Sequence, residues 1–261
     1  MGIIKSKIRQ SLVDFFTEVG DILVFTGNVV WQFFTAPFEF KELIKQGYYI
    51  GNKTVSLIAV TGFIMGLVLT LQSRPVLADF GAQSLLPGMI SVSIIREIGP
   101  VITALLCAGK ISSGIGAELG AMKVTEQLDA MEVSGAKPLN FVVATRVLAT
   151  TFLVPVLVVF ADAVGLLGSF FAVSMSGKIT FQFFMSQAFE ALTFSDIIPA
   201  TIKTFFFGFF IGLIGCYKGF NTERGTESVG LSANSAVVTT SLVIFVIDLI
   251  AVQLSQLVYG F

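Results

Sequence analysis

Residues 54–73 read TVSLIAVTGFIMGLVLTLQS, a run of 20 residues without a single charged side chain. A helix that crosses the hydrocarbon core of a bilayer needs about 20 consecutive, mainly apolar residues. Four more apolar runs follow along the chain, at residues 85–108, 147–175, 197–217 and 236–258. Open sheet edges cannot face hydrocarbon, because their unpaired backbone groups would find no partner there. The sequence therefore predicts an all-α membrane protein with five transmembrane helices.

The composition of the whole 261-residue chain agrees with a membrane location. Hydrophobic residues make up 54% of the chain and charged residues 13%, whereas about 25% of the residues of a soluble domain are charged. The net charge of −1 gives no general reason to expect nucleic-acid binding. The sequence has no histidine, which excludes histidine metal ligands and histidine general bases. We expect no metal, cofactor or catalytic residue in this chain.

The segment before the first span, residues 1–53, has its own amphipathic pattern. Its apolar side chains recur at helical spacing and are Leu12, Phe15, Phe16, Val19, Ile22 and Leu23. Polar side chains lie opposite them, at Asp14, Thr17, Glu18 and Asp21. A one-sided stripe of this kind is typical of a helix that lies in the membrane interface. Residues 22–38 are apolar enough to suggest a sixth span, which Asn28, Gln32 and Pro37 disfavour. We therefore predict an interfacial segment at 1–53 and a transmembrane domain at 54–261.

The distribution of lysine and arginine predicts the orientation. With five spans and a cytoplasmic N-terminus, most basic residues fall on the cytoplasmic side. They are Lys5, Lys7, Arg9, Lys41, Lys45, Lys53, Lys110, Lys123, Lys137, Arg146, Lys218 and Arg224. The outer loops would then hold Arg74 and Lys178. We predict a cytoplasmic N-terminus and a C-terminus on the outer side.

The segment between the second and third spans predicts an amphipathic helix on the cytoplasmic side. Its apolar positions follow helical spacing and are Ala117, Ala121, Val124, Leu128 and Met131. Its other positions carry more acids than bases, namely Glu118, Glu126, Asp129 and Glu132 against Lys123. Helices on the cytoplasmic membrane surface are usually basic, so an acidic one fits the groove of a partner protein better. The alternative is an ordinary helix packed against the spans, and the pattern alone does not decide between the two.

Three motifs around this segment carry a family resemblance. Residues 96–101 read Arg-Glu-Ile-Gly-Pro-Val, residues 116–122 read Gly-Ala-Glu-Leu-Gly-Ala-Met, and residues 125–131 read Thr-Glu-Gln-Leu-Asp-Ala-Met. In this order they resemble the signature of the MlaE (YrbE) permeases, and the resemblance extends from about Lys53 to the C-terminus. Several motifs in the right order are specific, whereas each one alone would be weak.

The resemblance implies a permease of an ATP-binding-cassette system in the inner membrane of a double-membraned bacterium, moving phospholipid between its inner and outer membranes. It implies a homodimer, a separate MlaF-like cassette ATPase that binds the ATP, an MlaD-like MCE-domain protein and often an MlaB-like STAS-domain protein. The chain itself would be a transport subunit, not an enzyme. The family also implies that the helix from Glu118 to Met131 is the coupling helix that docks onto the ATPase. Its candidate residues are Glu118, Lys123, Val124, Thr125, Glu126, Gln127, Leu128, Asp129 and Met131.

Charged residues inside the predicted spans form the candidate lipid-binding site. Arg96 and Glu97 lie near the middle of the second span and Lys203 lies in the fourth, where each charge costs roughly 2.5–3.5 kcal/mol on insertion scales. Arg96 and Glu97 point about 100° apart on a helix, so each needs a partner elsewhere. We predict that the three residues line a polar pocket for a phospholipid head group, because arginine and lysine bind phosphate well. The alternative is a set of ion pairs that only holds the helices together.

Three further points remain open at the sequence level. The G-x-x-x-G pairs at residues 62–66 and 208–212 permit close helix contact, either within the chain or across a dimer. Asp162 and Asp248 are interpreted as structural. They could instead join Glu97 in a proton- or ion-coupled secondary transporter, although five spans give no two-fold inverted repeat. An intramembrane aspartyl protease would also use Asp162 and Asp248, but the surroundings of Asp248 lack a G-x-G-D pattern.

Overall fold

The computed structural model describes residues 2–33, 40–175 and 179–259, with the backbone alone for residues 2–12, 14 and 15. Every regular element within these ranges is a helix, and five helical segments are long and apolar enough to cross a membrane. These segments are α2 (Phe40–Asp79), Gln83–Val124, Leu139–Ser174, α9 (Phe194–Phe220) and α10 (Thr226–Tyr259). The prediction of an all-α protein with five spans is confirmed. The described part of residues 22–38 belongs to α1 (Gly2–Phe33), which is not among the five candidate spans, and residues 34–38 lie outside the described ranges.

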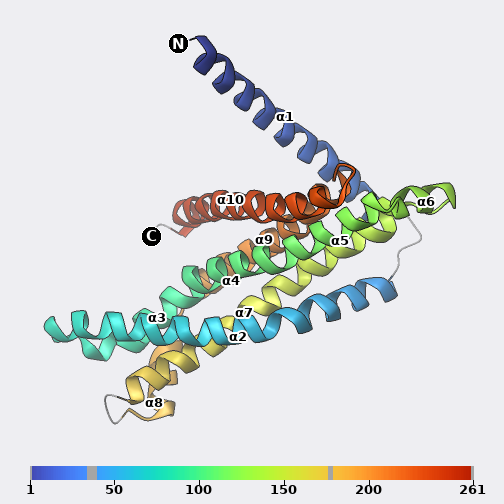
Figure 1. The fold of residues 1–261 in the computed structure, drawn as a ribbon. Coiled ribbons are helices and arrows are strands. Elements are labelled where there is room, and N and C mark those ends of the chain that lie inside the picture. The colour runs from blue at the N-terminus through green and yellow to red at the C-terminus, as the bar shows by residue number, and fades with distance from the viewer. Residues whose placement is uncertain (1, 34–39, 176–178, 260–261) are drawn as a thin grey trace.

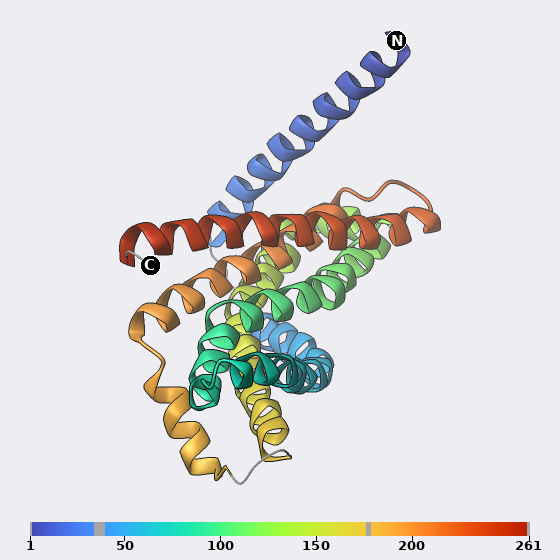
Figure 2. The same cartoon turned by 90° about the vertical axis from the view of Figure 1, so that its left-hand side faces the viewer.

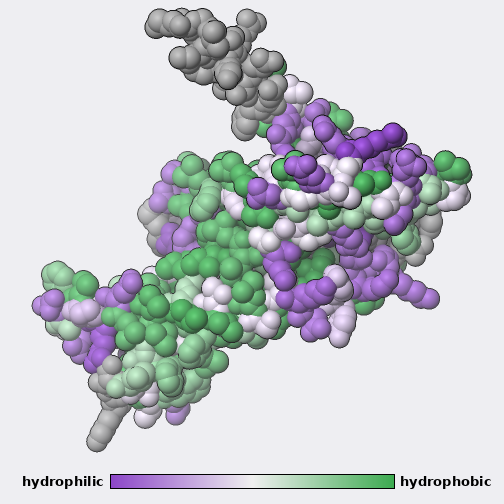
Figure 3. Space-filling view, in the orientation of Figure 1, coloured by the Kyte–Doolittle hydropathy of each residue, from purple (hydrophilic) through white to green (hydrophobic). Residues whose placement is uncertain are grey.

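The spans alternate in direction, and α7 (Thr145–Ser174) packs against both α2 and α9 (Figure 1). α2 contains 40 residues and is therefore about 60 Å long at 1.5 Å per residue, about twice the hydrocarbon thickness of a bilayer. It runs without a break across position 53/54. Hydrophobic residues dominate the middle of the molecular surface, and hydrophilic residues gather towards its ends (Figure 3). The spans therefore extend beyond the bilayer as helices.

Glycines allow α7 to lie very close to both of its neighbours. A Cβ atom added to Gly66 of α2 would lie 1.8 Å from the backbone oxygen of Gly165 on α7. A Cβ atom added to Gly208 of α9 would lie 2.5 Å from the backbone oxygen of Thr150, also on α7. Both G-x-x-x-G pairs thus contribute to helix contacts within the chain, which settles the point that the sequence left open.

The second span is one helical run of 39 residues built from alternating α and π segments. These are α3 (Leu86–Ser93), η2 (Ile94–Ile98), α4 (Gly99–Cys107), η3 (Ala108–Ser112) and α5 (Ser113–Val124). A short 3-10 turn, η1 (Gln83–Leu85), precedes it. The run ends at Thr125 and Glu126, and Glu126 has a left-handed backbone with a φ of 59°. The chain then turns into α6 (Gln127–Val133). The predicted single helix from Glu118 to Met131 is therefore wrong, because the left-handed residue divides it into two.

The buried face of α5 also differs from the predicted one. Ile115 and Leu119 are buried, whereas Ala121 is exposed. Gly116 and Gly120 lie on the buried face, where Ser232 and Ala236 of α10 approach them closely. The apolar periodicity missed this face because two of its positions are glycines, which make room for a neighbouring helix without adding hydrophobic side chains. Of the expected apolar positions, Leu128 is buried and Met131 packs against the core on α6.

Besides α6, the helices α1 and α8 lie outside the five spans. The last turns of α1 bury Phe25 and Val29, and α1 contacts both η4 (Leu139–Ala144) and α9. Phe25 packs edge-on against Tyr217 of α9 at a ring separation of 5.6 Å. Glu18 of α1 also pairs with Lys218, while the N-terminal part of α1 projects away from the bundle (Figure 2). α8 (Phe181–Glu190), between the third and fourth spans, was not predicted and packs against α3.

The contact between α2 and α7 yields a stability prediction. We expect Gly66→Ala to lower the stability of the folded chain by about 1–3 kcal/mol, the usual cost of overpacking, because its methyl group would overlap the Gly165 carbonyl. The thermal unfolding midpoint in detergent measures the effect. Gly47→Ala is the matched control on the same helix, since no atom lies within 4 Å of a Cβ at that position. Equal midpoints for the two variants would contradict the close contact.

Candidate functional site

The charged residues of the spans meet where the second span, α9 and α10 come together. Lys203 projects from α9 and its side chain is 4% exposed. Its ammonium group donates to Glu97 Oε2 of η2 at 2.7 Å and to Asp248 Oδ1 of α10 at 2.8 Å. Desolvating an isolated ammonium group is costly, and these two carboxylates offset that cost. We call Glu97, Lys203 and Asp248 the Lys203 cluster.

Arg96 points to a different partner from its neighbour Glu97. Its guanidinium Nη1 lies 3.7 Å from Asp196 Oδ1 near the start of α9, and its side chain is 34% exposed. Asp196 also accepts hydrogen bonds from the backbone nitrogen of Thr193 at 3.1 Å and from its hydroxyl at 2.6 Å, which completes a capping box. The prediction that Arg96 and Glu97 need separate partners is confirmed. Together, Arg96 and Glu97 link the second span to two positions on α9, Asp196 in its first turn and Lys203 in its third.

A π-helical turn positions these two side chains. In η2 the backbone N–H of Gly99 donates to the carbonyl of Ile94, five residues earlier. Pro100 has no N–H to donate to the carbonyl of Arg96, so the ordinary α-helical ladder is interrupted at this point. π turns inside α-helices are frequent at functional sites. The sequence Arg-Glu-Ile-Gly-Pro thus sets the backbone geometry that directs the two charges.

The structure brings all three predicted site residues together and adds two that the sequence interpretation missed. Arg96, Glu97 and Lys203 border one cleft, which Asp196 also lines. Asp248 is bonded to Lys203, although the sequence assigned it a separate structural role. Charge balance within the membrane could have revealed this pairing. A buried lysine inside a span needs carboxylate partners, and Asp248 is the one carboxylate in the fifth span, residues 236–258.

The cleft beside these charges is small in this conformation. Its volume is about 20 Å³, which suits a water molecule but is far below the several hundred Å³ typical of a ligand pocket. Glu97 is 41% exposed and faces outward from the bundle. A phosphate group could bind here only if Arg96 or Lys203 exchanged a carboxylate partner for it. The site as described is therefore closed and internally paired.

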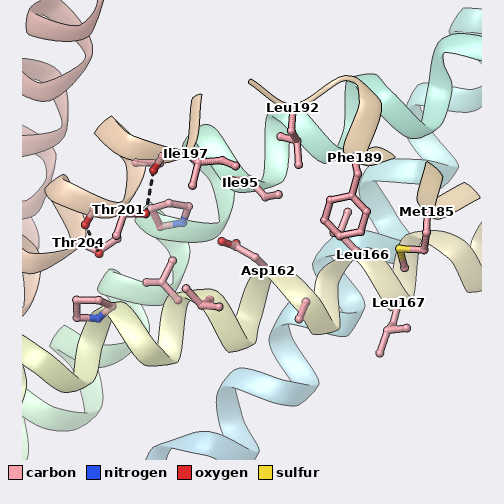
Figure 4. A pocket seen from close by; sticks show the side chains of 16 residues that line it. Ile95, Asp162, Leu166, Leu167, Met185, Phe189, Leu192, Ile197, Thr201 and Thr204 are labelled. Atoms are coloured by element: carbon pink, nitrogen blue, oxygen red, sulfur yellow. Dashed lines mark hydrogen bonds between the residues drawn. The ribbon is translucent and has the colours of Figure 1, made fainter. Parts of the chain in front are cut away.

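A larger apolar cavity lies next to the charged residues. It measures about 460 Å³ and lies between the second span, α7, α8 and α9. Its walls include Ile95, Leu166, Phe189 and Ile197, with Asp162 projecting from α7 among them (Figure 4). Asp162 is 9% exposed, and no described residue forms a hydrogen bond with its Oδ1. The cavity has the size and surface to accept an acyl chain.

Gly99 makes room for the Asp162 carboxylate. A Cβ atom at position 99 would lie 1.8 Å from Asp162 Oδ1, so the side chain fits only against a glycine. Ala200 and Thr204 of α9 line the same cavity, and Ala200 also lines the charged cleft. The apolar cavity and the charged cleft thus lie on either side of the same turn of α9.

The residues predicted for the coupling helix lie on both sides of the turn between α5 and α6. Glu118 of α5 accepts a hydrogen bond from the buried Arg146 at 2.8 Å. Lys123 donates to Asp129 at 2.8 Å across the turn. α5 also carries Val124; Thr125 and Glu126 form the break, and α6 carries Gln127, Leu128, Asp129 and Met131. α6 is the most exposed part of this region, with Val133 91% exposed at its end.

Comparisons with known proteins give a consistent result. The model of the family described as permease MlaE matches residues 43–254. A probable ABC transporter permease protein of Rickettsia typhi is 30% identical over 96% of this chain and 97% of its own length. The intermembrane phospholipid transport system permease protein MlaE of Haemophilus influenzae is 32% identical over 98% of this chain and 97% of its own. The chloroplastic protein trigalactosyldiacylglycerol 1 of Arabidopsis thaliana is 31% identical over 87% of this chain and 65% of its own.

The Lys203 cluster predicts non-additive effects of charge removal. Lys203→Met would leave Glu97 and Asp248 without their shared cation, so we expect it to be more destabilising than Asp248→Asn. In the double variant the repulsion between Glu97 and Asp248 disappears, because Asp248 is no longer charged. Part of the lost stability should then be recovered, with a coupling free energy of about 0.5–3 kcal/mol. Thermal unfolding in detergent provides the measurement. Lys45→Met, at an exposed lysine of α2, is the control, and strictly additive effects at positions 203 and 248 would argue against the cluster.

Proposed function

This chain belongs to the MlaE permease family, and from that premise we propose that it is the membrane-spanning subunit of an ATP-binding-cassette transporter that moves phospholipid between two membranes. The observation that carries the proposal is the position of the Lys203 cluster beside an apolar cavity of about 460 Å³. A phospholipid needs charged partners for its head group and an apolar wall for its acyl chains. The interior of this bundle offers both.

Arg96, Glu97 and Lys203 would bind the head group, with Asp248 as a fourth member of the site. Arg96 would be the first contact for a phosphate, because its side chain is 34% exposed and its Asp196 contact is long at 3.7 Å. Its planar fork suits a phosphate better than a point charge does. Lys203 would follow only if Glu97 or Asp248 moved away, since both now hold its ammonium group. Head-group binding would thus be coupled to the separation of α9 from the second span or from α10.

Two copies of the chain would form the complete site. α10 is the least buried of the five candidate spans, and its exposed apolar side chains include Leu242, Phe245 and Leu249. Glu97 faces outward from the protomer. A homodimer would cover these surfaces and enclose a cavity between the two Lys203 clusters.

A separate cassette ATPase would drive transport by pushing on α6. α6 and the turn before it carry acidic groups, and Val133 adds an exposed apolar contact. Lys123 ties α6 to the end of α5 through Asp129. From Glu97 to Val124 the second span is unbroken helix, so the two points are about 40 Å apart along it. A movement of α6 would therefore reach the head-group site through one continuous helical run.

The orientation and surroundings of the chain follow from the same proposal. The bundle end that carries α6 also holds most of the described basic residues, among them Lys53, Lys110 and Arg146, and this bias supports a cytoplasmic position. The N-terminus would be cytoplasmic and the C-terminus periplasmic, in a bacterial inner membrane. Residues 1–53 would form the interfacial segment and 54–261 the transmembrane domain. MlaD-like MCE-domain and MlaB-like STAS-domain proteins would complete the system.

A proton-coupled secondary transporter is the second candidate function. The observation that favours it is Asp162, a buried carboxylate whose Oδ1 has no hydrogen-bond partner among the described residues. Such a group in a membrane span is a possible proton carrier. Dissipating the proton gradient with ATP intact distinguishes the candidates, because this treatment would stop a proton-coupled carrier and leave an ATP-driven one running.

Reconstitution tests the division of labour between permease and ATPase. We expect liposomes that contain the chain with its cassette ATPase to transfer fluorescent phospholipid on addition of ATP. Liposomes that contain the chain alone should show no ATP-dependent transfer. ATP-driven transfer by the chain alone would refute the proposal.

α6 provides a separate prediction about docking. Val133→Glu places a charge at the exposed apolar end of α6, and we expect it to weaken co-purification of the ATPase about tenfold or more, as substitutions at interface hot spots do. Val133→Ala, which removes apolar surface without adding charge, should have a smaller effect. Both variants should fold normally, because Val133 is 91% exposed. Full ATPase binding by the glutamate variant would exclude this end of α6 from the interface.

A further inference from the structure

A second polar cavity lies at the end of the bundle that carries α6. It measures about 440 Å³ and lies between the first half of α2 and the segment formed by η3 and α5. Lys53 and Lys110 approach it from opposite sides, and Gln46, Tyr49 and Ser113 add polar groups. We call this cavity the lysine groove. It shares no lining residue with the cleft at the Lys203 cluster.

The charges of the lysine groove are not balanced internally. Lys53 donates a hydrogen bond to the Tyr49 hydroxyl and lies 3.8 Å from the centre of that ring. Lys110 is exposed, and neither lysine forms an ion pair with a described carboxylate. Glu118 also lines the groove, but its carboxylate pairs with the buried Arg146. The groove therefore presents two ammonium groups that lack an anionic partner.

Both lysines lie at the depth of lipid head groups. Lys53 directly precedes the apolar run of residues 54–73, so it marks one edge of the hydrocarbon layer. Lys110 follows Arg96 by 14 residues in an unbroken helix, which corresponds to about 21 Å. Half of the hydrocarbon thickness is about 15 Å. A helix with Arg96 near mid-membrane therefore brings Lys110 to the same interface as Lys53.

The inner wall of the lysine groove is apolar. Ile50, Ile111 and Ile115 line it, and each is at most 7% exposed. Two cations at the rim and an isoleucine wall below them match an amphiphile with an anionic head. Basic pockets between transmembrane helices on the cytoplasmic side are a recurrent form of anionic-lipid site. A soluble anion would need the lysines but would gain nothing from the apolar wall.

We propose that the lysine groove binds the phosphate head group of an anionic glycerophospholipid from the cytoplasmic leaflet. This site is additional to the Lys203 cluster and rests on the proposed function only for the assignment of this end to the cytoplasm. A lipid bound there bridges α2 to η3 and α5, the same helical run that links α6 to Glu97. Its occupancy therefore stabilises one position of that run. The alternative is that the side chains of Lys53 and Lys110 only extend into the membrane interface, without binding a particular lipid.

Photo-crosslinking tests the proposal on the chain purified with its ATPase. The complex is placed in phosphatidylcholine nanodiscs that contain a photoreactive phosphatidylglycerol, and the labelled peptides are identified by mass spectrometry. We expect adducts within residues 46–54 and 109–115. The double substitution Lys53→Gln and Lys110→Gln should weaken the labelling roughly 25-fold, as expected when two membrane-surface lysines are removed. Lys45→Gln removes an exposed charge from the same helix, at a residue that does not line the groove, and should leave the labelling unchanged.

Three outcomes would overturn the proposal. Labelling that persists in the double variant would show that the lysines select no lipid. Equal labelling by a photoreactive phosphatidylcholine would remove the preference for an anionic head group. Displacement of the lipid by millimolar inorganic phosphate would assign the groove to a soluble anion. Lipid transfer by the same complex is measured in parallel, so loss of labelling with intact transfer separates failure of this proposal from failure of the proposed function.

Discussion

The ammonium group of Lys203, held between two carboxylates inside the membrane, is the interaction on which the rest of the structure depends. It joins α9 to the second span through Glu97 and to α10 through Asp248. Burying an ammonium group on a side chain that is 4% exposed is costly, and these two partners offset the cost. Removing either carboxylate leaves one pair, but removing the lysine leaves two like charges close together. The helices therefore have one arrangement in which all three groups are satisfied.

The second span connects this arrangement to the far end of the molecule. Pro100 and the π turn at Ile94–Ile98 fix the directions of Arg96 and Glu97, and the helix then continues to Val124. Glu118 attaches it to α7 through Arg146 on the way. The left-handed backbone of Glu126 ends the run sharply. A force applied beyond that turn would thus act on one continuous helical run, which can bend at Pro100 and at its two π segments.

The sequence predicted the features that depend on composition and missed those that depend on close packing. The five spans follow from apolar length, and the separate partners of Arg96 and Glu97 follow from helix geometry. The partner Asp248 lies 45 residues from Lys203, and nothing local marks the pair. The buried face of α5 contains Gly116 and Gly120, which hydrophobic periodicity does not register. α8 contains 10 residues, too few to stand out as a span in an apolar chain.

The small volume of the charged cleft indicates which step of the proposed transport would need energy. A phospholipid head group cannot enter a space of about 20 Å³, so the proposed binding would require Arg96 or Lys203 to leave a carboxylate. The cluster satisfies its own charges when no lipid is bound, and a phosphate can replace a carboxylate as a partner for the same cation. Such an exchange would conserve charge pairing while it separated α9 from α10 or from the second span. In the proposed cycle, closing the site again would return the carboxylate and expel the head group, and a push along the second span would supply the work for this step.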